Sequence, residues 1–397
     1  MTETPSQSKG RSTSGRVDVI DLLRGWAVIV MIETHVFNAT LSNDLTSTKA
    51  FQYINFVNGL VAPSFLFASG LAYAVTAHRK IGTYLALGAP LFKQLSRLLL
   101  VLFIAYALHI PIFPVYRLLT EATEAQQQSF FQVDILQCIA VTLLSLQLML
   151  LLLRTERRLY RTTLILGVLI ILSTPWMWGF DFWTLVPWPI AAYLNGLRHS
   201  LFPLFPWSAF LFAGALTGFY FVRAREAKRP EGTGGEESMM RSLLWVGGSA
   251  ILLSIAIEPI ASSIFPNTGY WWTSPSFFLL RLGIVMLLLG GMYFATRVRG
   301  VSRNSVVTLI GRESLFVYVL HLLLIFGKFE DFNFKDEAGQ SFGYLEASIA
   351  TAILLLLMYG TARTWSRIKA NSPRLKLALN LLTLGIVVGV LLFGEGE

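Results

Sequence analysis

Residues 349–358 read IATAILLLLM, an apolar run without a single charged side chain. Similar runs cover residues 250–257 and 385–393. A helix needs roughly 20 mostly apolar residues to cross the hydrocarbon core of a bilayer. Of the 397 residues, 54% are hydrophobic and only 14% are charged, whereas an average soluble domain has about 25% charged residues. The sequence therefore excludes a water-soluble globular enzyme and predicts an all-α, polytopic integral membrane helical bundle.

Charged and turn residues divide the apolar sequence into candidate transmembrane helices. Eleven are predicted, at approximately residues 17–41, 53–77, 91–110, 133–153, 162–178, 203–222, 243–265, 277–296, 306–326, 344–364 and 375–393. They leave little room for a separate soluble domain, so residues 17–397 are predicted to form a single transmembrane domain. Residues 1–16 are rich in Ser, Thr and Gly, a composition typical of a disordered cytosolic tail.

The distribution of basic residues predicts the orientation of the bundle. Of the 32 Lys and Arg residues, 25 lie on the side of the N-terminus, 5 lie on the opposite side, and Arg24 and Arg281 lie within spans. Cytoplasmic connections of membrane proteins carry an excess of Lys and Arg. The N-terminus is therefore predicted to be cytoplasmic, and this topology accounts for the net charge of +9 without a nucleic-acid partner.

Ionisable residues inside the predicted spans are candidates for function, because burying them in a membrane is costly. In the first span, Arg24 and His35 are eleven residues apart, so they share a helix face and lie about 16 Å apart along the axis. Asp21 and Asn38 belong to the same face. Seven polar side chains are predicted at similar depth near the outer surface, where they could form a cavity: His35, His109, Asp134, Gln137, Glu258, Arg281 and His321.

Each of these residues also has a structural interpretation. Asp21 and Arg24 could pair at the inner interface, and His35 could make a buried hydrogen bond to another helix. His109, Glu258 and Arg281 could pair between helices or contact lipid headgroups. Seven of the ten Trp residues map to outer connections or span ends, which is typical of an interfacial aromatic belt or, alternatively, of a surface that accepts glycans.

Several signatures of soluble enzymes are missing from the sequence. There is no phosphate-binding glycine-rich loop, no Gly-x-Ser-x-Gly motif, and no pair of Cys or His residues at metal-ligand spacing. The single cysteine, Cys138, has no partner for an intrachain disulfide. No metal is predicted, and a histidine in a membrane cavity is the main chemical candidate.

Several segments resemble the heparan-α-glucosaminide N-acetyltransferase catalytic-domain family, part of the transmembrane acyltransferase superfamily. The sequence DLLRG at residues 21–25, followed by Met31 and His35, resembles the opening of that family. The spacing from Arg24 to His35 also resembles the motif of membrane acyltransferases that O-acetylate bacterial polysaccharides. Three further segments fit in chain order: APSFLFASG at 62–70, DILQCIA at 134–140, and FPW at 205–207 before Gly214 and Gly218. The segment 311–321, from GRESL to Tyr318 and His321, fits as well.

The resemblance implies a cytosolic acyl-CoA donor, with acetyl-CoA as co-substrate, and a carbohydrate acceptor across the bilayer. His35 would be the general base or would be transiently acetylated, with His109 and His321 as rivals. Asp134 and Gln137 would orient His35 or the acceptor. Arg24 would meet a CoA phosphate or the thioester carbonyl, assisted by Arg79, Lys80 and Arg97, and the remaining acceptor-binding candidates are Asn38, Glu258, Arg281, Ser314 and His321.

The sequence also differs from the family in two respects, and two functions other than acyl transfer stay open. The chain lacks the lumenal N-terminal domain expected of animal lysosomal enzymes, and residues 38–52 do not reproduce their histidine-bearing loop. This short form is typical of a bacterial plasma membrane, where heparan sulfate would not be the substrate, and a homodimer is one option for the assembly. The alternatives are a multi-pass transporter or flippase, in which the same ionisable groups form a substrate path, and a non-catalytic membrane partner.

Overall fold

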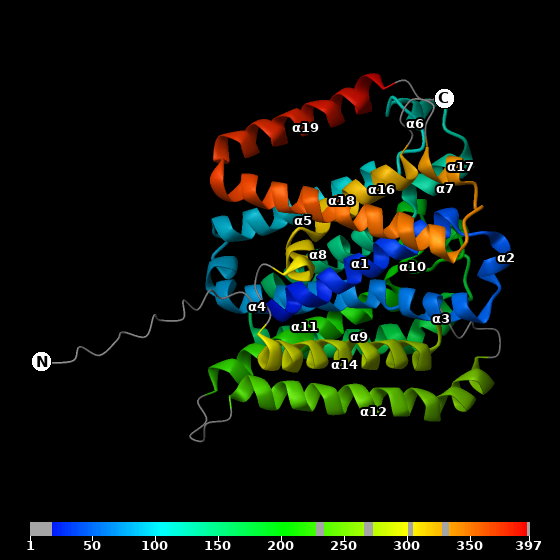
Figure 1. Cartoon of the computed structure of the whole chain (residues 1–397). Coiled ribbons are helices and arrows are strands. Elements are labelled where there is room, and N and C mark those ends of the chain that lie inside the picture. The colour runs from blue at the N-terminus through cyan, green and yellow to red at the C-terminus, as the bar shows by residue number, and fades with distance from the viewer. Residues whose placement is uncertain (1–17, 228–233, 266–272, 301–304, 328–332, 395–397) are drawn as a thin grey trace, which may run out of the picture.

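The computed structural model of the protein describes residues 18–227, 234–265, 273–300, 305–327 and 333–394. The predicted cytosolic tail of residues 1–16 lies outside these ranges. The described chain is built of helices joined by short connections, and its one β-type pairing is an isolated bridge between Leu41 and Phe342. The predicted all-α helical bundle is confirmed (Figure 1).

The helices follow one another along the chain with few long connections. In order they are α1 (Asp18–Thr40), α2 (Asn43–Thr46), α3 (Lys49–Asn58), α4 (Val61–Leu85), α5 (Ala89–Ala107), α6 (Arg117–Thr120), α7 (Glu124–Phe131), α8 (Ile135–Leu153), α9 (Glu156–Met177), the 3₁₀ helix η1 (Phe182–Thr184), α10 (Trp188–Leu194), α11 (Leu204–Glu226), α12 (Gly235–Ile264), α14 (Pro275–Arg299), α15 (Val306–Arg312), α16 (Ser314–Phe326), α17 (Phe334–Ala338), α18 (Tyr344–Asn371) and α19 (Pro373–Phe393).

The number of membrane spans is close to the predicted eleven. Among the described residues, nine helical segments are long and apolar enough to cross a membrane, and the bent pair α15–α16 makes a tenth. α1 corresponds to the first predicted span but is outside this set, and its 23 residues include four charged ones, Asp18, Asp21, Arg24 and Glu33. Large apolar side chains cover the outside of the bundle, including Leu252 on α12 at 70% exposure and Leu356 on α18 at 71%. Such a surface suits lipid and not water.

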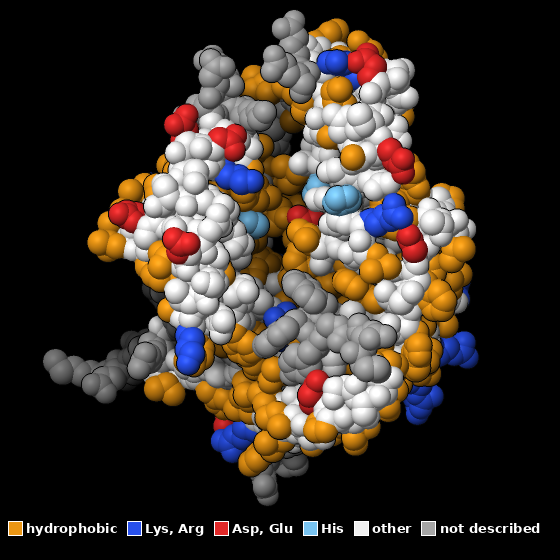
Figure 2. All heavy atoms as spheres, turned by 90° about the vertical axis from the view of Figure 1, so that its right-hand side faces the viewer, with side chains coloured by type: hydrophobic (Ala, Val, Ile, Leu, Met, Phe, Trp, Pro, Cys, Tyr) orange, Lys and Arg blue, Asp and Glu red, His pale blue; other side chains and the backbone are white. Residues whose placement is uncertain are grey.

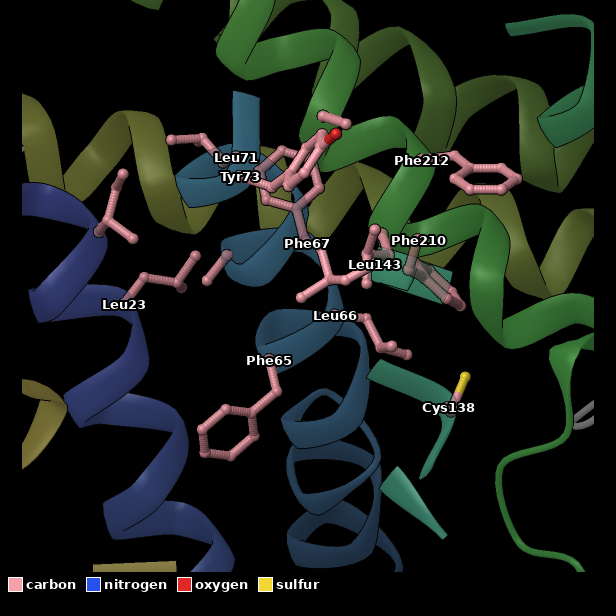
Figure 3. Close-up of a cluster of buried hydrophobic side chains, with 14 of the residues drawn as sticks. Leu23, Phe65, Leu66, Phe67, Leu71, Tyr73, Cys138, Leu143, Phe210 and Phe212 are labelled. Atoms are coloured by element: carbon pink, nitrogen blue, oxygen red, sulfur yellow. The ribbon is translucent and has the colours of Figure 1, made fainter. Parts of the chain in front are cut away.

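α1 lies in the middle of the bundle (Figure 1), where it contacts α4, α14, α15, α16 and α18. Many of its apolar side chains, among them Leu23, Val28 and Ile32, are fully buried. Around it, α4, α8 and α11 contribute bulky side chains to one buried hydrophobic cluster, which includes Phe67 of α4, Leu143 of α8 and Phe210 of α11 (Figure 3). The most polar of the predicted spans is thus shielded from lipid by the others, which is how a helix bearing ionisable groups is tolerated in a membrane.

Glycines allow α4 and α11 to pack closely. A Cβ atom on Gly214 would lie 1.9 Å from the carbonyl oxygen of Phe67, and one on Gly70 would lie 1.9 Å from that of Leu211. Small residues at helix interfaces are how membrane helices gain packing contacts. This contact holds the N-terminal half of α4 against α11 and so positions the side chains that both helices contribute to the outer end.

Replacing Gly214 with alanine is expected to destabilise the bundle, because the helices must separate to admit the new methyl group. Overpacking of this kind costs about 1–3 kcal/mol. The matched control is Gly291→Ala on α14, where an added Cβ meets nothing within 4 Å. Thermal unfolding in detergent should show a lower midpoint for Gly214→Ala only, and equal midpoints for the two variants would contradict the packing described.

The predicted ninth span, residues 306–326, is not a single straight helix. α15 and α16 meet at an angle of 88°, with Glu313 at the corner. Two contacts hold the corner. Gly311 packs directly against the backbone of α1, where an added Cβ atom would lie 1.9 Å from the carbonyl oxygen of Asp21. The buried carboxylate of Glu313 pairs with Lys369 of α18. Mean hydropathy does not register such a bend, because it averages over the break.

Candidate active site

Two cavities open near the end of the bundle that the charge distribution assigns to the extracytoplasmic side. The larger has a volume of about 670 Å³ and the smaller of about 390 Å³. His35, Asp134 and Tyr318 line both cavities. Figure 2 shows this face of the molecule hollowed near its centre, with histidine and acidic side chains at the margin of the hollow. The three shared residues therefore form a wall that is reached from two sides.

His35 lies in the last third of α1 and is partly exposed to the cavities. Its position follows from the helix around it, because Met31, Ile32 and Val36 are buried and fix the rotation of α1. The ring centroid of His35 is 5.3 Å from that of His321 and 5.7 Å from that of Phe326, both on α16. His35 is thus held against α16 while one part of its ring faces open space.

His321 is fully buried behind His35. Its Nδ1 atom donates a hydrogen bond to the carbonyl oxygen of Val317 at 2.9 Å, so a neutral ring carries its lone pair on Nε2. Among the described residues, that Nε2 atom has no hydrogen-bond partner. Tyr318, one turn earlier on α16, packs edge-on against the ring at a centroid distance of 5.7 Å. His321 therefore supports His35 from behind and does not line either cavity.

Asp134 is fixed by the start of α8. Its side chain caps the helix by accepting a hydrogen bond from the Ile135 amide at 2.7 Å, and the Gln137 side chain accepts one from the Asp134 amide at 3.2 Å. This is a capping box, which satisfies amides at a helix N-terminus. The Asp134 carboxylate also interacts electrostatically with His35 and Tyr318. One acidic side chain thus joins α1, α8 and α16.

His109 completes the wall of the smaller cavity together with Gln137. Its Nδ1 atom lies 2.8 Å from the carbonyl oxygen of Ala105 and 3.3 Å from Nε2 of Gln137, and its Nε2 atom lies 3.9 Å from the Asp134 carboxylate. The shorter contact requires a proton on Nδ1. Apart from Gln132, the rest of this cavity is mainly apolar, with Leu108 directly after α5 and further leucines from α8 and α16.

The larger cavity has a different lining, dominated by amides and aromatic rings. Asn38 of α1 contributes to it, as do Gln52, Asn55 and Asn58 of α3. The amide of Asn58 also donates to the Glu33 carboxylate at 2.8 Å, in the orientation of the amide that satisfies both groups. Aromatic walls come from Phe56, Phe65, Phe202 and Trp207. Amides and aromatic faces together suit the hydroxyl groups and ring faces of a sugar.

Sequence reasoning missed the three amides of α3 and the shared role of Tyr318. A signal for the amides was present, because Gln52, Asn55 and Asn58 repeat every three residues and so share a helix face. The predicted second span began at residue 53 and merged this short helix with α4. Placing a neutral polar side chain in a membrane also costs less free energy than placing an ionisable one, so neutral amides are weaker indicators of function in a sequence.

The other candidate residues line the larger cavity, lie outside both cavities, or lie toward the opposite end of the bundle. Arg281 of α14 lines the larger cavity. Glu258 of α12 accepts hydrogen bonds from Ser274 and Ser276 beside α14, and among the described residues it lines neither cavity. Ser314 begins α16 outside both cavities. The predicted donor residues lie toward the opposite end of the bundle, with Arg24 in the first half of α1 and the exposed side chains of Arg79, Lys80 and Arg97 on α4 and α5.

The outer tryptophans are divided between several roles. Trp207 is buried at the larger cavity, Trp178 donates a hydrogen bond to the Phe205 carbonyl at 3.0 Å, and Trp176 is 58% exposed on α9. Trp271 and Trp272 lie outside the described residues. Of the tryptophans that the structure describes, only Trp207 lines the larger cavity. A glycan-accepting role therefore concerns that one side chain, whereas the exposed position of Trp176 is typical of an interfacial aromatic belt.

Comparison with known proteins gives one result that covers most of the site. The profile of the family described as heparan-alpha-glucosaminide N-acetyltransferase, catalytic, matches residues 16–259. The matched segment contains α1 with His35, the amides of α3, and Asp134, whereas Arg281 and α16 follow it. Among curated proteins no match is found. The profile covers more than half of the chain, and the chain therefore belongs to the heparan-alpha-glucosaminide N-acetyltransferase catalytic family, which indicates a multi-pass membrane enzyme of the acyltransferase type.

Proposed function

We propose that this protein transfers an acetyl or related acyl group from cytosolic acyl-CoA to a sugar or amino sugar on the extracytoplasmic side. The observation that carries the proposal is the shared wall of His35, Asp134 and Tyr318 between two unlike cavities. Two cavities that share one wall would let donor and acceptor reach the same base from different sides. Membership of an acetyltransferase family supports the same chemistry.

In the proposed reaction, the unprotonated ring nitrogen of His35 removes a proton from the acceptor amine or hydroxyl. The acceptor atom attacks the thioester carbonyl, the carbon–sulfur bond breaks, and the departing CoA thiolate takes the proton from the imidazolium ring. The Asp134 carboxylate, which interacts with His35, stabilises the imidazolium while it exists. In the two-step alternative, the unprotonated ring nitrogen of His35 attacks the thioester carbonyl, the carbon–sulfur bond breaks and CoA leaves as the thiolate. The acceptor then attacks the carbonyl of the acylated ring, the carbon–nitrogen bond breaks, and the acceptor's proton passes to the CoA thiolate.

The unlike linings favour one assignment of the two substrates. The amide-lined larger cavity suits the sugar, and the leucine-lined smaller cavity suits the acyl end of the donor. Arg24, Arg79, Lys80 and Arg97, at the opposite end of the bundle, would bind the CoA phosphates. The location that fits this division is the plasma membrane of a bacterium, with coenzyme and acceptor on opposite sides.

The proposal is tested by offering the purified protein acetyl-CoA with a labelled acetyl group, together with a panel of amino sugars and envelope glycans. Free thiol and labelled acceptor should appear together in equal amounts. Thiol release without a labelled acceptor would indicate hydrolysis, and no thiol release with any acceptor would contradict the proposal.

One observation favours a second candidate, a transporter. The break between α15 and α16 at Glu313 resembles the discontinuous helices around transporter substrate sites. A transporter would accumulate unmodified substrate in sealed vesicles without acyl-CoA, whereas the proposed enzyme should not. This measurement separates the two functions even before the acceptor is identified.

A further inference from the structure

Tyr318 is the one member of the shared wall whose chemistry the proposed reaction does not use. Its side chain lines both cavities, as do those of His35 and Asp134. Only 6% of its surface is exposed, and its ring packs edge-on against His321 at a centroid distance of 5.7 Å. The buried ring therefore holds the phenolic hydroxyl at a defined position in the wall.

The hydroxyl of Tyr318 lies at the end of the side chain that meets Asp134. The two groups are within hydrogen-bonding reach of each other. One carboxylate oxygen of Asp134, Oδ1, accepts the hydrogen bond from the Ile135 amide at 2.7 Å, and the other, Oδ2, lies 3.9 Å from Nε2 of His109. The hydroxyl hydrogen rotates about the C–O bond, so it can turn from this carboxylate toward an oxygen atom in either cavity.

The proposed reaction needs a hydrogen-bond donor beside His35. When a nucleophile attacks a thioester, negative charge forms on the carbonyl oxygen, and a donor already held at that position stabilises the transition state. In the shared wall, His35 receives the proton of the acceptor, and the carboxylate of Asp134 accepts hydrogen bonds without donating any. Tyr318 is then the one neutral donor among the three residues.

Other donors in the described part of the site line one cavity each. Asn38 and the amides of α3 line the larger cavity but not the smaller, and Gln137 lines the smaller but not the larger. Gln137 is also engaged, because its Oε1 atom accepts from the Asp134 amide and its Nε2 atom lies 3.3 Å from Nδ1 of His109. Tyr318 differs from them because it borders the spaces assigned to both substrates.

We propose that the Tyr318 hydroxyl donates a hydrogen bond to the thioester carbonyl oxygen of the acyl donor and stabilises the negative charge that forms there. The inference rests on the proposed function. Tyr318 keeps its proton throughout, and the electron pair on the oxygen re-forms the carbonyl bond when the carbon–sulfur bond breaks. Once the hydroxyl has turned away, the carboxylate of Asp134 can stabilise the imidazolium of His35. Direct transfer and the two-step route both pass through such an oxygen.

Tyr318→Phe removes the hydroxyl and leaves the ring against His321. Its kcat should fall by roughly 10²- to 10³-fold, the loss typical of removing one donor to such an oxygen, with little change in KM for acetyl-CoA or in the thermal midpoint. The control is Tyr293→Phe on α14, because Tyr293 is also buried but lines neither cavity. This control should keep the wild-type kcat, and a wild-type kcat in Tyr318→Phe would overturn the proposal.

A binding measurement distinguishes transition-state stabilisation from simple donor binding. The thioether S-ethyl-CoA has no carbonyl oxygen, so the wild type and Tyr318→Phe should bind it with equal affinity. Weaker binding by the variant, with a matching rise in KM for acetyl-CoA and an unchanged kcat, would place the hydroxyl against another part of the donor and overturn the proposal.

A double variant separates a direct role from one exerted through Asp134. The losses in Tyr318→Phe and Asp134→Asn should multiply when the two are combined, because they act on different atoms of the transition state. Tyr318→Phe should also keep the pH profile of kcat, since His35 and its carboxylate partner remain. A double variant no slower than Asp134→Asn would show that Tyr318 only holds Asp134 in place, and would overturn the proposal.

The wild-type protein distinguishes failure of this role from failure of the proposed function. Thiol release and labelled acceptor are measured for the wild type and Tyr318→Phe side by side. Transfer at equal rates by both would reject the hydrogen bond from Tyr318 and leave the acyltransferase intact. No thiol release by the wild type with any acceptor would reject the acyltransferase and this role with it.

Discussion

Replacing His35 with alanine is expected to reduce acyl transfer by roughly 10²- to 10⁴-fold, the contribution typical of general acid–base catalysis. The reason is geometric, because His35 lies in the shared wall of both cavities and is partly exposed to them. The side chain is not part of the fully buried core, so the fold should persist. Acetyl-CoA turnover, radiolabel transfer and thermal unfolding should be measured on the same preparation.

His199→Ala is the matched control for this variant. His199 is exposed in the connection before α11, near the same end of the bundle, and lines neither cavity among the described residues. The control should keep wild-type transfer. Full activity in His35→Ala would move the base to His109, which also lines the smaller cavity.

The second large effect is expected at Asp134, where two substitutions separate two roles. Asparagine is as good a helix cap as aspartate, so Asp134→Asn should keep the hydrogen bond to the Ile135 amide and unfold near the wild-type temperature. It removes the charge that would stabilise the His35 imidazolium, so transfer should fall by roughly 10- to 100-fold, equivalent to about 1.4–2.7 kcal/mol.

Asp134→Ala removes the cap as well as the charge. It should lose a similar amount of activity and, in addition, about 1 kcal/mol of stability. Thermal unfolding and kcat measured for both variants provide the comparison. If Asp134→Asn transferred acyl groups at the wild-type rate while Asp134→Ala did not, Asp134 would act only by shaping the start of α8.

Much of the fold could be predicted because membrane helices are marked by hydrophobicity alone. Nine of the eleven predicted spans are helical in the structure except at a few terminal residues, and the other two are interrupted, residues 53–77 by the turn between α3 and α4 and residues 306–326 by the corner at Glu313. The corner at Glu313 was not predicted, because it depends on the contact of Gly311 with α1 and on the pairing of Glu313 with Lys369, 56 residues later. Neither partner is visible in a local apolar run.

The sequence predicts how deep each candidate side chain lies in the membrane, but it does not predict which neighbouring helix or cavity the side chain faces. Position along a span gives the depth of a side chain, and on that basis Glu258 and Arg281 were grouped together. The structure directs Arg281 into the larger cavity and Glu258 toward Ser274 and Ser276. The rotation of a helix depends on which neighbours bury its apolar face, and α12 and α14 pack mainly against each other.

If the proposed function is correct, an acyl group from a cytosolic donor reaches an acceptor on the other side of the membrane. This transfer can be measured in sealed vesicles with the N-terminal side of the protein outward. Acetyl-CoA with a labelled acetyl group is supplied outside, and a sugar acceptor is enclosed within. We expect covalent label on the enclosed sugar, free CoA thiol outside, and neither product with His35→Ala. Label on sugar supplied outside but none on the enclosed sugar, or export of unmodified sugar without thiol release, would contradict it.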